Sequence, residues 1–173
     1  ICGTPSASAV SWVDRSNGYV TTQFYEGVVH PNGSSFFGGL QDNGTLRGTA
    51  GNPNWAILQG GDGGSVALDT QNDGNTNNDV LFAEFTGLSI QKSVNNGATF
   101  SSAVSGITDS FFAFIAPFTM NEGNRQQMWT GGGYLWRTTN QATTWTRASA
   151  LTCGNGSVSA IAVHPADGNR VLA

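Results

Sequence analysis

An eight-residue pattern that occurs twice in this chain indicates its fold. Residues 93–100 read SVNNGATF, and residues 138–145, which start 45 positions later (138 minus 93), read TTNQATTW. Both follow the pattern Ser/Thr-x-Asp/Asn-x-Gly-x-Thr-aromatic, with Ala142 in the glycine position of the second copy. The hydroxyl and amide side chains can bond nearby backbone amides, a glycine accepts a positive φ, and the aromatic packs beneath the turn. The pattern therefore predicts two tight hairpins, with Phe100 and Trp145 buried under them.

Short apolar runs that end at a turn recur along the rest of the chain. They end at His30, Asp69, Ala116-Pro117 and His164-Pro165, at intervals of 39, 47 and 48 residues (69 minus 30, 116 minus 69, 165 minus 117). A polar loop and a second strand-like run follow each of them, at residues 35–39, 80–84, 127–131 and 170–173. A period of roughly 40 to 50 residues, built of short strands and Gly/Asn turns, is typical of propeller blades.

The composition agrees with an all-β fold. Of the 173 residues, 10% are charged and 24 are glycine, and Lys92 is the only lysine. Gly, Asn, Ser and Thr are poor helix formers and favour turns or strands. The net charge of −4 and the lack of any Lys/Arg cluster argue against nucleic acid as a partner. No apolar stretch approaches the ~18 residues of a membrane-spanning helix, so no membrane span is predicted.

The strand count predicts a single propeller segment over residues 1–173, with about three four-stranded antiparallel blades of an incomplete β-propeller. We expect the blades at about 19–59, 65–104 and 111–148, the end of a preceding blade at about 1–14, and the start of a further blade at about 157–173. A closed propeller needs at least ~4 blades. An open arc exposes apolar blade faces. We therefore expect either a longer polypeptide or homo-oligomer partners to cover the open ends.

The first third of the chain carries a more specific resemblance. Residues 38–45 read GGLQDNGT and residues 60–64 read GGDGG, after a His-Pro pair at His30. With the two octapeptides, this order resembles the secreted bacterial BNR/Asp-box repeat β-propellers of the sortilin/xyloglucanase type, often labelled BNR-repeat glycosyl hydrolases. Both octapeptides depart from the Asp-box, because Asn replaces Asp in each. The resemblance implies an extracellular or cell-surface protein whose binding face carries aspartates in Gly-rich loops.

Asp42 and Asp62 are the candidate catalytic residues. Asp42 follows the second strand of the first predicted blade, and Asp62 precedes the first strand of the next. Propeller topology places both connections on one face, opposite the octapeptide hairpins. Two carboxylates on one face are what glycoside hydrolysis needs. Asp-Asn-Gly and Gly-Asp-Gly are also good turn sequences, and such loops suit calcium, the one cofactor we consider. Gln41 and Asn43 flank Asp42 and are candidate ligand-binding residues.

Two aromatic residues, Trp129 and Tyr134, are further ligand-binding candidates, because aromatic rings stack on sugars. Such residues also fill the space between propeller blades. His30 and His164 both occupy the His-Pro position at a strand end, which indicates an architectural role rather than a catalytic one.

Cysteines and sequons suggest covalent modifications. Cys2 and Cys153 have no metal-ligand spacing, which leaves one disulfide in an oxidising compartment or two buried thiols. Asn-x-Ser/Thr sequons at Asn32, Asn43 and Asn155 lie in predicted loops, where glycans can attach.

Two classes of function remain. The first is a non-catalytic propeller segment of a secreted or cell-surface protein, acting in glycan or protein binding or in extracellular assembly. The alternative is part of a glycoside hydrolase of the xyloglucanase-like type, with Asp carboxylates on the binding face. The lack of a complete active-site set within the chain favours the first.

Overall fold

The computed structural model describes residues 11, 13, 15, 21–150, 152, 154 and 156–173 of the chain. In these residues the fold is all-β: three four-stranded antiparallel sheets are followed by a two-stranded sheet. One short 3-10 turn, Thr76–Asn78, is the only helical element among them. No described helix is long and apolar enough to cross a bilayer. The predicted all-β class is therefore confirmed.

Each four-stranded sheet is built from strands that follow one another in the chain. The first sheet contains β1 (Phe24–Val29), β2 (Ser35–Leu40), β3 (Gly44–Thr49) and β4 (Asn52–Gln59). The second contains β5 (Val66–Asp69), β6 (Val80–Phe85), β7 (Ser89–Ser93) and β8 (Ser101–Ser102). The third contains β9 (Phe118–Met120), β10 (Met128–Gly131), β11 (Leu135–Thr138) and β12 (Thr146–Arg147). The last pair is β13 (Ala162–His164) and β14 (Asp167–Leu172).

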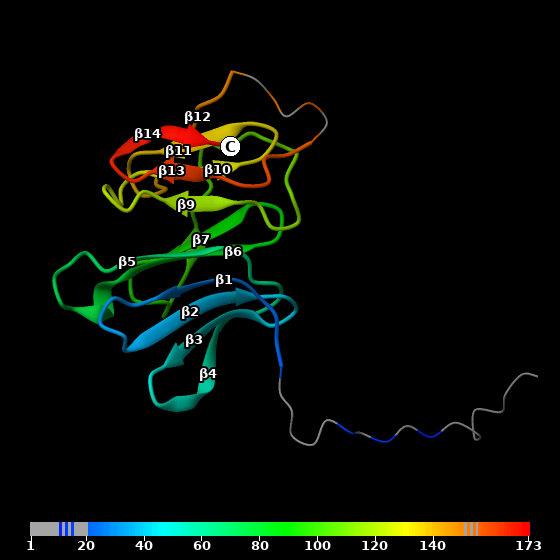
Figure 1. Ribbon diagram of the computed structural model, residues 1–173, viewed down its shortest axis with the longest axis vertical. Coiled ribbons are helices and arrows are strands. Elements are labelled where there is room, and N and C mark those ends of the chain that lie inside the picture. The colour runs from blue at the N-terminus through cyan, green and yellow to red at the C-terminus, as the bar shows by residue number, and fades with distance from the viewer. Residues whose placement is uncertain are drawn as a thin grey trace, which may run out of the picture.

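The sheets lie one after another along the long axis of the molecule, from β1–β4 to β13–β14 (Figure 1). Within each sheet, neighbouring strands pair as hairpins; β6 and β7, for example, pair from Leu81 with Ser93 to Phe85 with Ser89. This arrangement is that of successive blades in an unclosed β-propeller. The three four-stranded sheets lie inside the residue ranges that the sequence predicts for blades.

The main core lies between the second and third sheets. Its most buried side chains come from inner strands and from the second octapeptide, and include Phe82, Ile90, Met128, Trp136 and Trp145. The inner strands are covered on both faces: β6 is buried from Val80 to Glu84, and β10 is buried along its whole length.

The two octapeptides form the predicted hairpin loops at β7–β8 and β11–β12. In the first, the Ser93 hydroxyl accepts a hydrogen bond from the Gly97 amide at 2.8 Å. In the second, Ala142 replaces this glycine at a φ of 60°. Trp145 is 2% exposed and donates from Nε1 to the Ala103 carbonyl at 2.8 Å, so its predicted burial is confirmed. Phe100 is only half-buried. Its predicted burial is therefore met only in part.

The first strand of the third sheet lies later than the sequence pattern indicates. The apolar run ending at Pro117 was expected to be that strand, but β9 starts after it, at Phe118. Pro117 instead ends the incoming connection, and its carbonyl accepts a hydrogen bond from the Gly131 amide at 3.2 Å. The equivalent strand end is Asn121, whose Oδ1 accepts from the Gly123 amide at 2.9 Å. At the other strand ends the side chain likewise accepts a hydrogen bond from the backbone amide two residues later in the chain. These residues are His30, Asp69 and His164.

In each of the first two sheets, a cation on the third strand contacts the next sheet. Arg47 donates from Nη1 to the Asn96 carbonyl at 3.2 Å, and Lys92 donates from Nζ to the Gln141 carbonyl at 2.9 Å. Both pairs are 49 residues apart in the chain. The two acceptors occupy the same octapeptide position and share positive φ values of 54° and 55°. The sheets are therefore joined by a repeated polar contact as well as by apolar packing.

Candidate functional site

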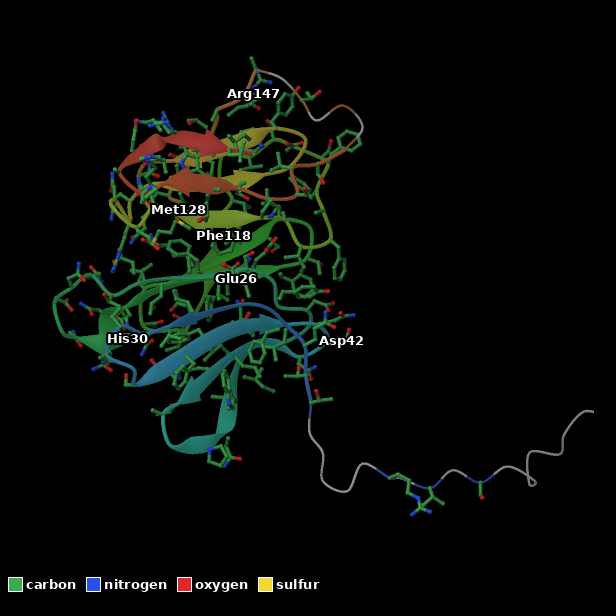
Figure 2. All side chains as sticks on the ribbon, in the orientation of Figure 1. Glu26, His30, Asp42, Phe118, Met128 and Arg147 are labelled. Atoms are coloured by element: carbon green, nitrogen blue, oxygen red, sulfur yellow. The ribbon has the colours of Figure 1, made fainter. Side chains whose placement is uncertain are left out.

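Asp42 and His30 lie at opposite ends of the first sheet, which defines two edges of the arc (Figure 2). Asp42 lies in the turn between β2 and β3 and has a φ of 61°. Asp62 lies in the connection from β4 to β5. We call the edge that carries both residues the Asp42 edge. The octapeptide turns lie with the His30 end, because their Asn96 and Gln141 carbonyls contact cations near that end of the strands.

The two aspartates that the sequence singles out are in direct contact. The Asp42 amide donates a hydrogen bond to Asp62 Oδ1 at 2.8 Å. Asp62 also forms a parallel bridge with Gly44, and the Gly63 amide donates to the Leu40 carbonyl at 2.9 Å. The Gly-rich connection is thus laid against the β2–β3 turn. The Asp62 carboxylate is half-buried and oriented by the backbone that it holds, whereas Asp42 is exposed.

Glycine is required where these two loops meet. A Cβ atom at Gly39 would overlap the Gly64 carbonyl oxygen, and one at Gly63 would overlap the Gly44 carbonyl oxygen. Only backbones without side chains can approach this closely. The glycine runs on either side of Asp42 and Asp62 therefore bring the two loops together.

Gln41 and Asn43 lie beside Asp42, on the exposed side of the turn. The Tyr25 hydroxyl donates to Gln41 Oε1 at 3.2 Å. Asn43 Nδ2 donates to the Gln41 carbonyl at 2.9 Å and to Thr22 Oγ1 at 3.2 Å. Four predicted residues thus meet at one edge, and the structure adds Tyr25 to them. The sequence signal for Tyr25 was its place on the strand that pairs with β2.

Two exposed phenylalanines extend this edge toward the third sheet. The Phe85 ring lies so close to Gly61 that a Cβ there would overlap it, which places the ring against the Asp62 loop. The Phe114 carbonyl accepts a hydrogen bond from the Gly87 amide at 3.0 Å, just beyond the end of β6. Phe85 is 41% exposed and Phe114 is 59% exposed. Sequence reasoning missed both, because an apolar residue in a short run does not reveal whether its neighbours cover it.

A buried carboxylate lies beneath the same edge. Glu84 is 1% exposed, and its carboxylate accepts from the Ser65 amide at 3.1 Å and from the Ala116 amide at 2.7 Å. It therefore joins the connections that lead into β5 and β9. Burial raises the pKa of Glu84 to about 7, helped by the negative charge of Glu26, and these hydrogen bonds only partly oppose the rise. The sequence feature that could have indicated this buried carboxylate is that Glu84 is the one charged residue in the otherwise apolar strand β6.

Tyr134 lies in the turn between β10 and β11, and Asp109 holds its backbone. Asp109 Oδ2 accepts from the Tyr134 amide at 2.8 Å and from Trp136 Nε1 at 3.1 Å. Burial raises the pKa of Asp109, but the hydrogen bonds from Trp136 and Tyr134 outweigh it, and the net pKa is lowered. The Tyr134 ring is half-buried under the Arg147 guanidinium, 4.6 Å from the ring centroid.

Trp129 lies between the third sheet and the β13–β14 pair. It is 5% exposed, and its Nε1 donates to the Gly168 carbonyl at 3.1 Å. The Arg137 guanidinium lies 5.6 Å from the ring centroid. Little of the ring is left for stacking on a sugar, and its position is that of an inter-sheet packing residue.

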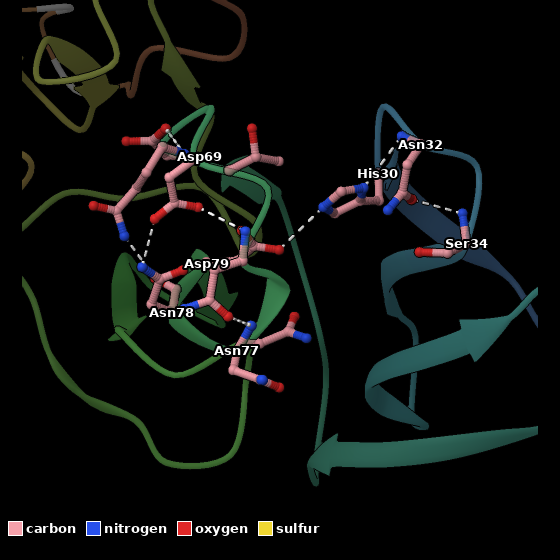
Figure 3. A network of polar contacts seen from close by, with 12 residues as sticks. His30, Asn32, Ser34, Asp69, Asn77, Asn78 and Asp79 are labelled. Atoms are coloured by element: carbon pink, nitrogen blue, oxygen red, sulfur yellow. Dashed lines mark hydrogen bonds and ion pairs between the residues drawn. The ribbon is translucent and has the colours of Figure 1, made fainter.

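The opposite edge is a network of turn side chains (Figure 3). The buried His30 Nε2 lies 3.1 Å from Asp79 Oδ2, and His30 Nδ1 accepts from the Asn32 amide at 3.2 Å. Burial raises the pKa of Asp79, and the contact with His30 opposes the rise. The contact joins the first two sheets, which agrees with an architectural role for His30.

The remaining sequence predictions fall on exposed or undescribed positions. Asn32 and Asn43 are exposed, although Asn32 Oδ1 accepts from the Ser34 amide at 2.8 Å. Cys2, Cys153 and Asn155 lie outside the described residues. In the described part of the chain, no three His, Cys, Asp or Glu side chains gather in a way that could hold a metal ion.

Known structures resemble this fold, whereas no protein-family model and no curated protein sequence matches the chain. The GH74 enzyme of Niastella koreensis matches with a TM-score of 0.59 and 23% identity, over 83% of this chain and 23% of that one. The GH74 xyloglucanase of Xanthomonas campestris matches with a TM-score of 0.59 and 12% identity, over 84% of this chain and 26% of that one. The chain thus spans about a quarter of each enzyme. At this identity the likeness shows the fold, a segment of a β-propeller.

Proposed function

We propose that this chain is a non-catalytic β-propeller segment of a secreted or cell-surface protein, and that it binds a glycan or protein at the Asp42 edge. The observation that carries the proposal is the hydrogen bond from the Asp42 amide to Asp62 Oδ1. Hydrolysis by this pair requires two carboxylates that flank the scissile bond, one as acid and one as base or nucleophile. Asp62 instead uses its carboxylate to hold the neighbouring loop.

The same edge has the groups that a binding site needs. Gln41, Asp42 and Asn43 present amide and carboxylate groups to solvent, and Tyr25 and Phe85 add aromatic surface. Sugars offer hydroxyl groups at the ring edge and apolar C–H faces above it, which such a mixed surface matches. The extracellular location rests on the resemblance to secreted propellers.

The open ends of the arc are the places for further blades or for other copies of the chain. Val29, Trp55 and Ile57 of the first sheet are exposed at 58%, 41% and 70%. An apolar sheet face of this kind is normally covered in a stable assembly. The short span relative to the two GH74 chains supports a larger propeller as its setting.

Affinity electrophoresis and calorimetry with xyloglucan, other plant polysaccharides and bacterial polysaccharides test the proposal. We expect binding by the wild-type chain without release of reducing ends. Asp42→Asn and Tyr25→Phe should weaken binding at least several-fold, whereas Asp167→Asn, an exposed carboxylate on β14, should not change it. Unchanged binding by both Asp42→Asn and Tyr25→Phe would show that the ligand does not bind at the Asp42 edge.

The alternative is part of a glycoside hydrolase in which Asp42 works with a carboxylate from outside this chain. It is favoured by the fold shared with the two GH74 structures, one of which is a xyloglucanase. This alternative predicts hydrolysis by a longer polypeptide that contains the segment, lost on Asp42→Asn. Hydrolysis by the chain alone that either Asp42→Asn or Asp62→Asn abolishes would also exclude the non-catalytic proposal.

A further inference from the structure

The contact between the second and third sheets brings an amine, a carboxamide and a carboxylate together. Lys92 Nζ lies 3.1 Å from Gln141 Oε1, and Gln141 Nε2 donates to Asp69 Oδ2 at 2.7 Å. We propose that Lys92 and Gln141 form an intramolecular isopeptide bond that covalently links the two sheets. The site is unrelated to the Asp42 edge and does not depend on the proposed function.

Each partner is held in place by independent contacts. The Gln141 amide donates to the Gln126 carbonyl at 2.8 Å, and its own carbonyl accepts from Lys92 Nζ at 2.9 Å. Asp69 is 5% exposed, and its other oxygen, Oδ1, accepts from the Gln71 amide at 2.9 Å and from Arg125 Nη1 at 3.2 Å. Oδ2 is therefore left to face the Gln141 carboxamide.

The chemistry is the aminolysis of an amide, and it balances without any co-reactant. The Lys92 amine attacks Gln141 Cδ, the Nζ–Cδ bond forms, and the Cδ–Nε2 bond breaks. One proton passes from Nζ through the Asp69 carboxylate to Nε2, which leaves as ammonia. Lys92 Nζ lies beside the carboxamide that it attacks once it is neutral, and Asp69 contacts the leaving nitrogen. Holding the amine and the carboxamide in contact makes their reaction effectively unimolecular, which favours it over the same reaction between free groups.

Partial burial favours the neutral amine that the attack requires. The Lys92 side chain is half-buried, whereas its contact with the Phe82 ring, with Nζ 5.6 Å from the ring centroid, favours the charged form. Burial lowers the pKa of Lys92, and the charge of Asp69 opposes the change. A desolvated lysine is the usual form of a nucleophilic lysine in proteins.

The neighbouring contact between the first and second sheets is an internal comparison. Arg47 occupies the position of Lys92, and Asn96 occupies that of Gln141, but Arg47 reaches only the Asn96 carbonyl. A guanidinium stays protonated and does not act as a nucleophile here. The joint between the first two sheets is therefore non-covalent, and a link is expected at only one of the two.

Intact-mass measurement of the purified chain, fresh and after incubation at mildly alkaline pH, tests the proposal. We expect the wild-type chain to lose the mass of one ammonia molecule, and trypsin to stop cutting after Lys92. Tandem mass spectrometry should then identify one peptide that joins Lys92 to Gln141. Lys92→Arg keeps the charge and the hydrogen-bond donors and should retain the full mass. Asp69→Asn should slow the loss at least tenfold.

Two outcomes would overturn the proposal. One is a wild-type chain that keeps its full mass and is cut after Lys92. The other is an ammonia loss that persists in Lys92→Arg, because the loss would then come from succinimide formation at an Asn-Gly pair such as Asn43-Gly44.

Discussion

Glu84 makes the stability of this protein depend on pH in a direction opposite to that of most carboxylates. Its pKa is raised from 4.5 to about 7 in the folded chain, mainly by burial. A raised pKa means that the folded state binds the proton more tightly than the unfolded state. The stabilisation is fully present below pH 4.5 and is lost as the pH rises through about 7. The shift corresponds to about 3 kcal/mol at ~1.4 kcal/mol per pKa unit.

Urea unfolding followed by tryptophan fluorescence measures this effect. Between pH 5 and pH 8 the free energy of unfolding of the wild-type chain should fall by roughly 2–3 kcal/mol relative to Glu84→Gln. Glutamine has no titrating group, so the variant removes the contribution of Glu84 while all other groups stay the same in both proteins. The Ser65 and Ala116 amides both donate to the Glu84 side chain, and the NH2 group of a glutamine cannot accept one of these hydrogen bonds. The Glu84→Gln variant should therefore be less stable than the wild type at pH 5.

The reasoning would be refuted by parallel stability curves for the two proteins from pH 5 to pH 8. It would also be refuted if wild-type stability rose relative to the variant, because the ionised carboxylate would then be the favoured form. Glu26→Gln offers a finer check. Removing that neighbouring charge should lower the pKa of Glu84 and shift the wild-type transition to lower pH.

Three further predictions concern the fold. Ala142 has a φ of 60°, so Ala142→Gly should stabilise the chain by up to about 1 kcal/mol in thermal unfolding, whereas Ala98→Gly, in the first octapeptide at a negative φ, should destabilise it. Trp145→Ala should cost about 3–5 kcal/mol of unfolding free energy, as for other large buried aromatics, and a normal melting curve would contradict its place in the core. Gly39→Ala should lower the melting temperature and disturb the Asp42 edge, because its Cβ would overlap the Gly64 carbonyl oxygen, whereas Gly60→Ala meets open space and should melt like the wild type.

Local sequence chemistry predicts much of the architecture. The octapeptide hydrogen bonds, such as Ser93 Oγ with the Gly97 amide, join residues within four positions, so the pattern alone indicates them. The strand ends at His30 and Asp69 are also fixed by local hydrogen bonds, because each side chain accepts from the amide two residues later. The pattern misplaced the first strand of the third sheet by several residues. An apolar run before Pro117 resembles a strand whether or not a partner strand is present to pair with it.

The candidate site was predicted in part. Propeller topology placed Asp42 and Asp62 on one edge, because the two connections that carry them share a face of any blade pair. Topology does not show that the Asp62 carboxylate accepts a hydrogen bond from the Asp42 amide, since that depends on how closely the two loops approach, here 2.8 Å between the two atoms. The role of Trp129 was ambiguous in sequence, because an aromatic on a strand suits both stacking on a ligand and packing between sheets.

The sequence by itself determined the class of fold, the number of four-stranded sheets and the edge on which Asp42 and Asp62 lie, because these follow from interactions between near neighbours and from the order of the strands. Only the tertiary structure decided which distant groups meet. It buried Glu84 beneath two connections, enclosed Trp129, and placed Lys92, Gln141 and Asp69 in contact. The physical reason is that burial and desolvation arise from the packing of whole sheets against one another, and no short stretch of sequence carries that information.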